Sequence, residues 1–394
     1  MKNQRLLLED PNREREATEA VVIERLRLRQ FRNYAELELE PASGMNVLVG
    51  ANAQGKSNLL EAVYLLSTTK SFRASRDSEA IRAGDSEAEV AATVRRSDGG
   101  SADVAITLGA GERKLARING ARAPRATDLL GTMQAVFFGA LDLRLVTGDP
   151  PARRRYMDLA ISQTRPAYCH DLAAYRRALT HRSHLLRSLR ECWVRDSGLE
   201  VWTEQLVRYG SPLLAGRLAF AGELAELAAE AHGNLSGSAE ALGVRYVSSP
   251  RLPDGAGPEG LATAFAAALE RARDEEIRRG ATLVGPQRDD LKFEINGMDA
   301  RVYGSQGQQR TVVLSLKVAE QSYMERHSGE RPVMLLDDVM SDLDDQRRAR
   351  LLERVRGHCQ TFVTCTNLRG FPPDLLSDAR VFIVREGSLQ AADT

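Results

Sequence analysis

Residues 50 to 57 read Gly50-Ala51-Asn52-Ala53-Gln54-Gly55-Lys56-Ser57. The spacing G-x-x-x-x-G-K-[ST] is typical of a phosphate-binding loop, in which glycines let backbone N–H groups surround phosphate oxygens. An apolar stretch, 45–49, precedes the loop, and 58–67 has the apolar spacing of a helix, so the loop stands in the strand–loop–helix context that it requires. We therefore predict that these eight residues bind ATP, with Lys56 reaching the β- and γ-phosphates and Ser57 binding Mg²⁺.

The lysine of this loop supports the prediction. Only six of the 54 basic residues of the chain are lysines, so an arginine is what chance would favour at this position. A glycine turn that arose by chance is the alternative, and Lys56 makes it the weaker one.

A second apolar strand ends in two carboxylates. Residues 333–336 are apolar and are followed by Asp337 and Asp338. We predict that Asp337 holds Mg²⁺ and that Asp338 polarises the water that attacks the γ-phosphate. Many apolar strands end in Asp, so this pattern gains its meaning from the phosphate-binding loop.

A small turn before a helical stretch supplies a third element. Ser305-Gln306-Gly307-Gln308-Gln309 precedes 311–321, and a helix N-terminus with such a turn attracts phosphate. We predict that Ser305, Gly307 and Gln308 contact the γ-phosphate of an ATP held by a second copy of the chain; a plain helix cap is the alternative. The order of loop, turn, acidic strand and then Ser341-Asp342-Leu343-Asp344 indicates an ABC-type ATPase.

The interval between Gly55 and Gly307 is too long for a compact ABC domain and contains helical patterns. We predict an α/β fold, an ABC/SMC-like P-loop ATPase head with an inserted α-helical arm, and a restart or kink of one arm helix at Pro212. The predicted segments are a polar and disordered N-terminal extension (1–20), the N-terminal part of the head (21–148), the arm (149–279) and the C-terminal part of the head (280–394).

The charge of the chain is balanced overall but not locally. The 54 basic and 54 acidic residues cancel, yet the stretch from Arg144 to Asp196 holds eleven arginines and five acidic residues. We expect a DNA-binding surface there, and a merely solvated basic face is the alternative. The helical spacing of Leu172, Tyr175 and Leu179 points these side chains inward, which we expect to leave the arginines outward.

Other features favour a cytoplasmic protein without a membrane segment. No apolar run approaches the length of a membrane span, and residues 1–20 lack the apolar centre of a signal peptide. The four cysteines, Cys169, Cys192, Cys359 and Cys365, lack paired metal-ligand spacing, so we expect buried thiols rather than zinc ligands or disulfides.

Several further blocks, together with these motifs, resemble the RecF family over roughly residues 21–384. The blocks are Phe31-Arg32-Asn33-Tyr34, residues 52–62, Lys70-Ser71-Phe72-Arg73, residues 153–158, Gly285-Pro286-Gln287-Arg288-Asp289-Asp290-Leu291 and residues 305–311. The resemblance implies an ATP-dependent homodimer with slow, DNA-stimulated ATP hydrolysis. It also implies binding to single-stranded and gapped DNA with RecR, and indirectly with RecO and RecA, in recombinational repair, replication restart and the SOS response.

The resemblance also assigns residues. It places Thr364 at a switch that contacts the γ-phosphate through a hydroxyl, and it raises the expectation that the arginine-rich stretch contacts DNA. The expected DNA contacts are Arg153, Arg154, Arg155, Arg176, Arg177 and Arg182.

The chain departs from the family pattern at two places. Gly139-Ala140-Leu141 stands where the family usually has Ser-Pro-Glu, and Gln287 stands where His is common. The first departure leaves open which residue of the loop before Asp142 senses Mg²⁺ or water. Gln134 is a weak candidate for the Q-loop glutamine of an ABC ATPase.

Three other functions remain open from the sequence. They are an ATPase subunit of a transporter or of another SMC-like system, an SMC-like head fused to a nuclease, and a nucleotide switch that does not hydrolyse ATP. The long helical insertion argues against the first. The sequence holds no second acidic constellation for the second, and Asp338, shorter than the usual Glu, keeps the third open.

Overall fold

The computed structural model describes residues 20–111, 113–191, 198–237, 240–253, 255, 257–342 and 345–392. The prediction of a disordered extension falls, apart from Ala20, outside the described residues. So do Leu343 and Asp344 of the predicted D-loop, and Cys192. Within these ranges no helix is long and apolar enough to cross a membrane.

A six-stranded sheet forms the centre of the head, in the order β15-β14-β3-β13-β12-β8. Its strands are β3 (Met45–Val49), β8 (Ala135–Gly139), β12 (Val333–Asp337), β13 (Thr361–Cys365), β14 (Arg380–Arg385) and β15 (Ser388–Ala391). All neighbours are parallel except β14 and β15. The carboxyl ends of β3, β12 and β13 therefore meet at one edge, which brings the phosphate-binding loop beside the acidic strand.

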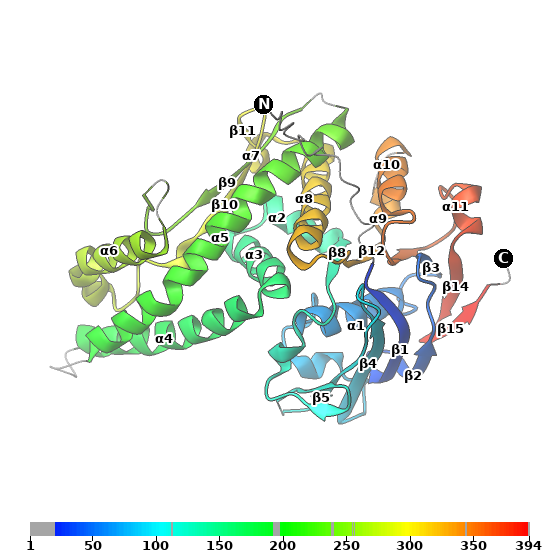
Figure 1. Cartoon of the computed structure of the whole chain (residues 1–394), viewed down its shortest axis with the longest axis horizontal. Helices are drawn as coiled ribbons and strands as arrows, with labels where there is room; N and C mark the ends of the chain where they lie inside the picture. The colour runs from blue at the N-terminus through cyan, green and yellow to red at the C-terminus, as the bar shows by residue number, and fades with distance from the viewer. Residues whose placement is uncertain are drawn as a thin grey trace, which may run out of the picture.

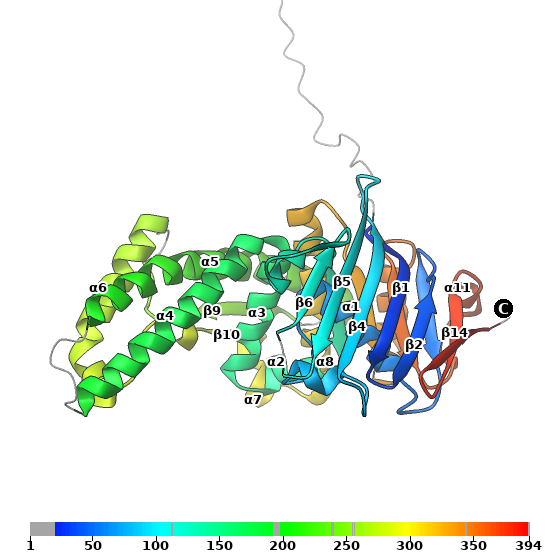
Figure 2. The ribbon, with the colours of Figure 1, turned by 90° about the horizontal axis from the view of Figure 1, so that it is seen from below.

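A second, antiparallel sheet covers one face of the first, in the order β2-β1-β4-β5-β6-β7. Its strands are β1 (Val22–Phe31), β2 (Tyr34–Leu39), β4 (Glu87–Arg95), β5 (Ser101–Gly109), β6 (Leu115–Ile118) and β7 (Ala121–Arg122). Helix α1 (Lys56–Thr68) lies in the core between the two sheets, with Leu59, Val63 and Leu66 almost fully buried. Its apolar spacing and the alternating burial of β1 follow from this packing (Figure 2).

Four long helices project from the head to one side (Figures 1 and 2). They are α3 (Pro150–Thr164), α4 (Pro166–Arg190), α5 (Leu199–Ser236) and α6 (Pro258–Arg279). Strand β9 (Leu242–Val247) pairs with β10 (Asp290–Ile295), which pairs with β11 (Met298–Asp299). The α/β head with a helical arm is confirmed, and a small sheet from both sides of residue 280 lies in the arm; the four segment boundaries stay a prediction.

Pro212 was predicted to restart or kink its helix, and the restart is wrong, while the kink stays a prediction. Helix α5 is one element of 38 residues that contains Pro212. Proline cannot donate the helical hydrogen bond to the carbonyl four residues earlier, that of Arg208, so the helix lacks one internal bond there. Burial of Leu206, Leu213 and the neighbouring apolar side chains holds the helix together across the proline.

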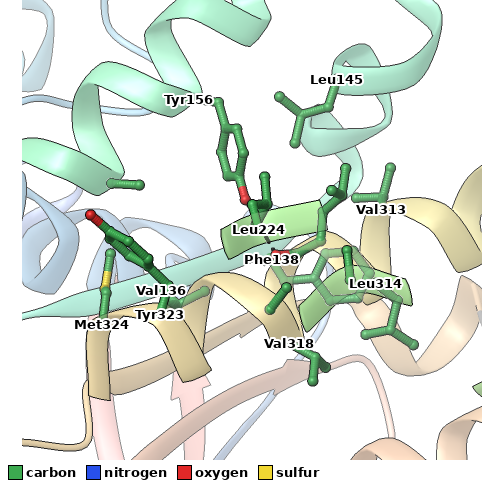
Figure 3. Packing of buried hydrophobic residues seen from close by; sticks show 14 of the residues in the cluster. Val136, Phe138, Leu145, Tyr156, Leu224, Val313, Leu314, Val318, Tyr323 and Met324 are labelled. Atoms are coloured by element: carbon green, nitrogen blue, oxygen red, sulfur yellow. Dashed lines mark hydrogen bonds between the residues drawn. The ribbon is translucent and has the colours of Figure 1, made fainter. Parts of the chain in front are cut away.

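The opposite face of the central sheet is covered by α8 (Gln306–Ser328). Figure 3 shows Val136 and Phe138 of β8 packed with Tyr156 of α3, Leu224 of α5 and Val313 of α8. The base of the arm and the head thus share one apolar core. The remaining short elements are η1 (Asp77–Ala80), η2 (Ala126–Leu129), η3 (Ala140–Leu143), η4 (Pro286–Arg288), α2 (Arg144–Thr147), α7 (Ala300–Tyr303), α9 (Val339–Asp342), α10 (Asp345–Val355) and α11 (Pro373–Ser377).

Candidate nucleotide-binding site

The phosphate-binding loop joins the end of β3 to the start of α1, as predicted. Gly55 precedes the helix with a φ of 117°, and a Cβ there would lie 2.7 Å from the Asn33 amide nitrogen. Both facts demand glycine. No side chain caps the start of α1, so its first N–H groups point into the loop, where a helix N-terminus favours a phosphate.

Lys56 lies at the mouth of this loop. Its ammonium donates to the carbonyls of Gly50 and Ala51, at 2.6 Å and 2.8 Å. Burial lowers the pKa of Lys56, while Asp338 and Asp337 act in the opposite direction. The side chain is thus anchored where a phosphate chain wrapped by the loop would meet it.

Ser57, Asp337 and Thr364 form a chain of hydrogen bonds across three elements. The Ser57 hydroxyl donates to Asp337 Oδ1 at 2.6 Å, and the Thr364 hydroxyl donates to the same oxygen at 2.8 Å. A hydroxyl and a carboxylate side by side are the oxygen ligands that Mg²⁺ prefers, so the residues fit the predicted ion. Mg²⁺ held there would neutralise phosphate charge.

Thr364 also fixes Asp338, because the Thr364 hydroxyl accepts the backbone N–H of Asp338 at 2.9 Å. Asp338 has a φ of 53°, in the left-handed region that Asp adopts more readily than most residues. Such backbones concentrate at functional sites. Thr364 therefore holds the carboxylate of Asp337 and the backbone of Asp338, while its predicted contact with the nucleotide stays a prediction.

Two turns support the loop through Gln54, and the sequence reasoning assigned no role to them. Asn33, in the turn between β1 and β2, donates to the Gln54 carbonyl at 2.9 Å, and Gly387, between β14 and β15, donates to the same oxygen at 3.0 Å. Tyr34 donates to the carbonyl of Gly55. The family resemblance of residues 31–34 was the only sequence signal for this support.

A buried carboxylate on α1 organises the same side of the site. Glu61 is fully buried and accepts from Arg32, Arg73 and Ser71. Burial raises the pKa of Glu61, but the hydrogen bonds from Arg32 and Ser71 outweigh it, so the pKa is lowered. Glu61 therefore stays ionised and ties the loop after α1 to the β1–β2 turn.

The predicted second phosphate site begins α8. Ser305 caps the helix: its hydroxyl accepts the N–H of Gln308 at 3.2 Å, and the Gln308 side chain accepts the N–H of Ser305 at 2.8 Å. Gln308 also donates to Glu240 at 2.8 Å, from the segment between α5 and β9. Ser305 and Gly307 are exposed, and Val302 and Tyr303 beside them are 67% and 69% exposed.

A buried charge cluster connects β8 to α8. Lys317 of α8 pairs with Asp142 at 3.2 Å and with Glu320 at 3.0 Å, and Asp142 accepts the N–H of Gly139. Burial disfavours the Lys317 ammonium, but Asp142 and Glu320 outweigh burial, so the pKa of Lys317 is raised. Gly139 lies opposite Asp337 in the sheet, so this cluster joins the acidic edge to the helix that carries Ser305.

Gln134 is not near this edge, so its candidacy was wrong. It precedes β8, and Ala135 is in register with Val333 at the amino end of β12. Its side chain is buried and donates to the Gln163 carbonyl. Because parallel strands align their ends, Gln134 lies at the edge opposite to the nucleotide site.

Two of the predicted DNA-contacting arginines are interior, which corrects the prediction. Arg153 is 5% exposed and forms a two-bond pair with Asp290, at 2.6 Å and 3.0 Å. Arg182 is 1% exposed and pairs with Glu276 at 2.7 Å. A side chain so enclosed cannot reach a DNA phosphate, and both arginines act instead as internal ties.

Arg154, Arg155, Arg176 and Arg177 lie at the surface in part or in full. Arg154 donates to the Asp289 carbonyl at 2.7 Å, and Arg155 donates to the Ser71 carbonyl at 2.8 Å. For these four residues, contact with DNA stays a proposal.

The family described as "RecF/RecN/SMC N terminal domain" matches residues 22–372. "DNA replication and repair protein RecF" of Halalkalibacterium halodurans is 40% identical over 368 residues, covering 93% of this chain and 99% of that protein. The protein of the same name from Heliobacterium modesticaldum is 42% identical over 372 residues, covering 94% of this chain and 99% of its own length. The chain belongs to the RecF family.

Solved structures agree with this assignment. "Structure of the recombination mediator protein RecF-ATP in RecFOR pathway" is 32% identical to the chain, with a TM-score of 0.89, and covers 96% of this chain and 100% of that one. An Smc head from Pyrococcus furiosus is 18% identical, with a TM-score of 0.53 over 94% of this chain and 96% of that one, and shows the fold alone. The chain therefore has the RecF type of ABC ATPase head.

The two places where the chain departs from the RecF pattern are both bound by neighbouring residues. Gly139-Ala140-Leu141 leads into η3, where Asp142 binds back to Gly139 and reaches Lys317. Gln287 accepts a hydrogen bond from the Tyr175 hydroxyl and donates to the Val284 carbonyl. Within this RecF-family chain, both departures are held by neighbours from other elements.

Proposed function

We propose that the chain hydrolyses ATP slowly, with DNA stimulation, in a site completed by a second copy. One copy supplies residues 50–57, Asp337 and Asp338, and the other supplies Ser305, Gly307 and Gln308. Two copies facing one another in this way form two such sites, and ATP becomes part of the contact between them.

The observation that carries this proposal is the separation of two phosphate-binding elements within one chain. Among the described residues, the hydrogen bonds of 305–308 run within α8, to its own cap and to Glu240, and none reaches 50–57. The exposed apolar side chains of Val302 and Tyr303 lie beside Ser305. An exposed helix N-terminus flanked by apolar side chains suits contact with another head.

The residues divide the chemistry as follows. The loop and Lys56 bind the phosphate chain, and Ser57 with Asp337 holds Mg²⁺, whose role is to neutralise phosphate charge. Asp338 orients and polarises the attacking water. Ser305 of the other copy adds N–H and hydroxyl groups to the γ-phosphate, so turnover requires the pair of heads.

The names of the relatives support a proposal for the biological role. Proteins 40% and 42% identical are named for DNA replication and repair, and a solved relative is titled a recombination mediator of the RecFOR pathway. We propose that this chain binds single-stranded and gapped DNA with RecR and, through RecO, supports RecA loading, replication restart and the SOS response. Exposed arginines bind DNA phosphates and carry affinity without sequence preference.

Sedimentation with and without ATP and gapped DNA tests the proposal. We expect a monomer without nucleotide, a dimer with ATP, and a larger complex when gapped DNA is added to the dimer. A chain that stays monomeric at saturating ATP contradicts the composite site. A dimer that does not sediment with DNA contradicts the proposed role in repair.

A further inference from the structure

Segments from three parts of the chain meet beside α3. Arg155 of α3 donates to the carbonyl of Ser71, after α1. Arg154 donates to the carbonyl of Asp289, which follows η4. Residues 153–158 and 285–291, distant in sequence, therefore lie side by side on the RecF-family head, and the loop 70–73 borders them through Arg155.

A pocket of about 270 Å³ opens at this place, between α3 and α4. Its polar lining comes chiefly from Arg154, Arg155, Asp158, Arg176 and Arg217. Arg176 enters from α4 with a side chain 63% exposed, whereas Arg217 forms the floor and is 2% exposed. The pocket thus has a rigid cationic floor and an accessible cationic rim.

The carboxylates at the pocket are already engaged. Asp158 pairs with Arg217 at 2.8 Å and with Arg176 at 3.2 Å. Asp289 pairs with Arg217 at 2.8 Å. In the described part of the chain, no carboxylate lies within ion-pair distance of Arg154 or Arg155, and these two side chains donate to backbone carbonyls. The pocket therefore has an excess of positive charge.

The pKa values of two nearby basic side chains, Arg154 and Lys70, reflect this positive charge. Burial lowers the pKa of Arg154 and the charge of Arg217 lowers it further, while Asp289, Asp290 and Asp158 act in the opposite direction without cancelling the shift. Burial also lowers the pKa of Lys70; Lys114, Arg155 and Arg176 add to this effect and Asp77 opposes it. Cations that disfavour one another's charge are stabilised by an anion placed among them.

We propose that this pocket binds a phosphodiester group of the DNA backbone, with Arg154, Arg155 and Arg176 as its ligands. Guanidinium groups match phosphate oxygens in geometry as well as charge. A nucleic acid fits better than a single small anion because the exposed Lys70 carries positive charge beyond the pocket, as consecutive phosphates require. The inference rests on the proposed DNA binding and specifies where it occurs.

Arg155→Gln, Arg176→Gln and the double variant test the site. Fluorescence anisotropy with a labelled gapped DNA, over a series of KCl concentrations, measures affinity and its salt dependence. Each lost phosphate contact lowers the slope of log affinity against log salt by about one unit, so the double variant should lose about two. We expect its affinity at low salt to fall by at least about tenfold.

The controls separate this site from DNA binding in general. Arg271→Gln removes the same charge from an exposed position on α6, outside the pocket, and should keep the wild-type slope. Arg155→Lys keeps the charge and should recover most of the slope. Melting temperatures report folding, and if Arg155→Gln fails to fold, Arg176→Gln carries the test alone because its side chain is largely exposed.

Pocket variants that bind DNA with the affinity and slope of the wild-type protein overturn the phosphate site and leave the proposed DNA binding intact. An equal loss in Arg271→Gln also overturns it, because the charge would then act without a site. Failure of the wild-type chain to bind gapped DNA refutes the proposed function instead.

Discussion

The nucleotide site is built around one contiguous loop, whereas the arginines of the helical arm are held by partners from distant parts of the chain. In the first, residues 50–57 and the end of β12 lie together as expected. In the second, Arg153 and Arg154 are neighbours in sequence, yet Arg153 is paired in the interior and Arg154 reaches the surface pocket. The conformation of a contiguous loop can be predicted from its own residues. Whether an arginine is buried or exposed depends on ion-pair partners that are distant in the sequence.

The largest expected effect sharpens the nucleotide half of this comparison. Asp338→Asn should reduce ATP turnover by about 10²- to 10⁴-fold, because it removes the group that polarises water. Asn accepts the left-handed backbone of this position, so the loop should keep its shape. Steady-state hydrolysis with gapped DNA measures the loss, and size-exclusion chromatography should show a long-lived ATP dimer. Unchanged turnover would remove Asp338 from the mechanism.

Arg182→Met tests whether an arm arginine is structural. Removing one partner of a buried pair leaves Glu276 uncompensated, at a cost of about 3–5 kcal/mol in the free energy of unfolding. Chemical denaturation measures it. Arg182→Met together with Glu276→Leu removes both charges and should recover much of the stability. A loss below about 0.5 kcal/mol for the single variant would mean that the pair is not a tie.

Lys56→Ala should weaken ATP binding by about 10- to 100-fold, since a charge-assisted contact is worth about 1.5–3 kcal/mol. ATP-dependent dimerisation should disappear while the fold persists. Titration calorimetry gives the affinity and circular dichroism reports the fold. Wild-type affinity in this variant is incompatible with the assignment of the loop.

Arg177→Gln should have the smallest effect. The side chain is exposed on α4 and does not line the pocket, so we expect a stability change within about 0.5 kcal/mol. If Arg177 contacts DNA from the rim, the salt slope falls by no more than about one unit. A stability loss as large as that of Arg182→Met would contradict the distinction between the exposed face of α4, with Arg177, and its buried face, with Arg182.

Elements with a local sequence signal could be predicted, and contacts between distant residues could not. Apolar spacing located α1 and β3, and the Asp337–Asp338 pair located the acidic edge. Arg182 was misplaced although it lies seven residues after Tyr175, a spacing that returns to the same inward face of a helix. Its partner Glu276 comes from another helix, and no local sequence pattern predicts that ion pair. Glu240 and Gly387 likewise act across long sequence separations, which periodicity does not report.

Mixing two inactive variants tests the composite site most directly. Ser305→Arg leaves the phosphate-binding loop intact and blocks the N-terminus of α8. Lys56→Ala disables the loop and leaves the N-terminus of α8 intact. Each alone should show little turnover. A heterodimer of the two contains one site with both halves intact, so the mixture should regain ATP hydrolysis that rises with the fraction of heterodimer. A mixture no more active than its separate components would contradict a site shared between two copies.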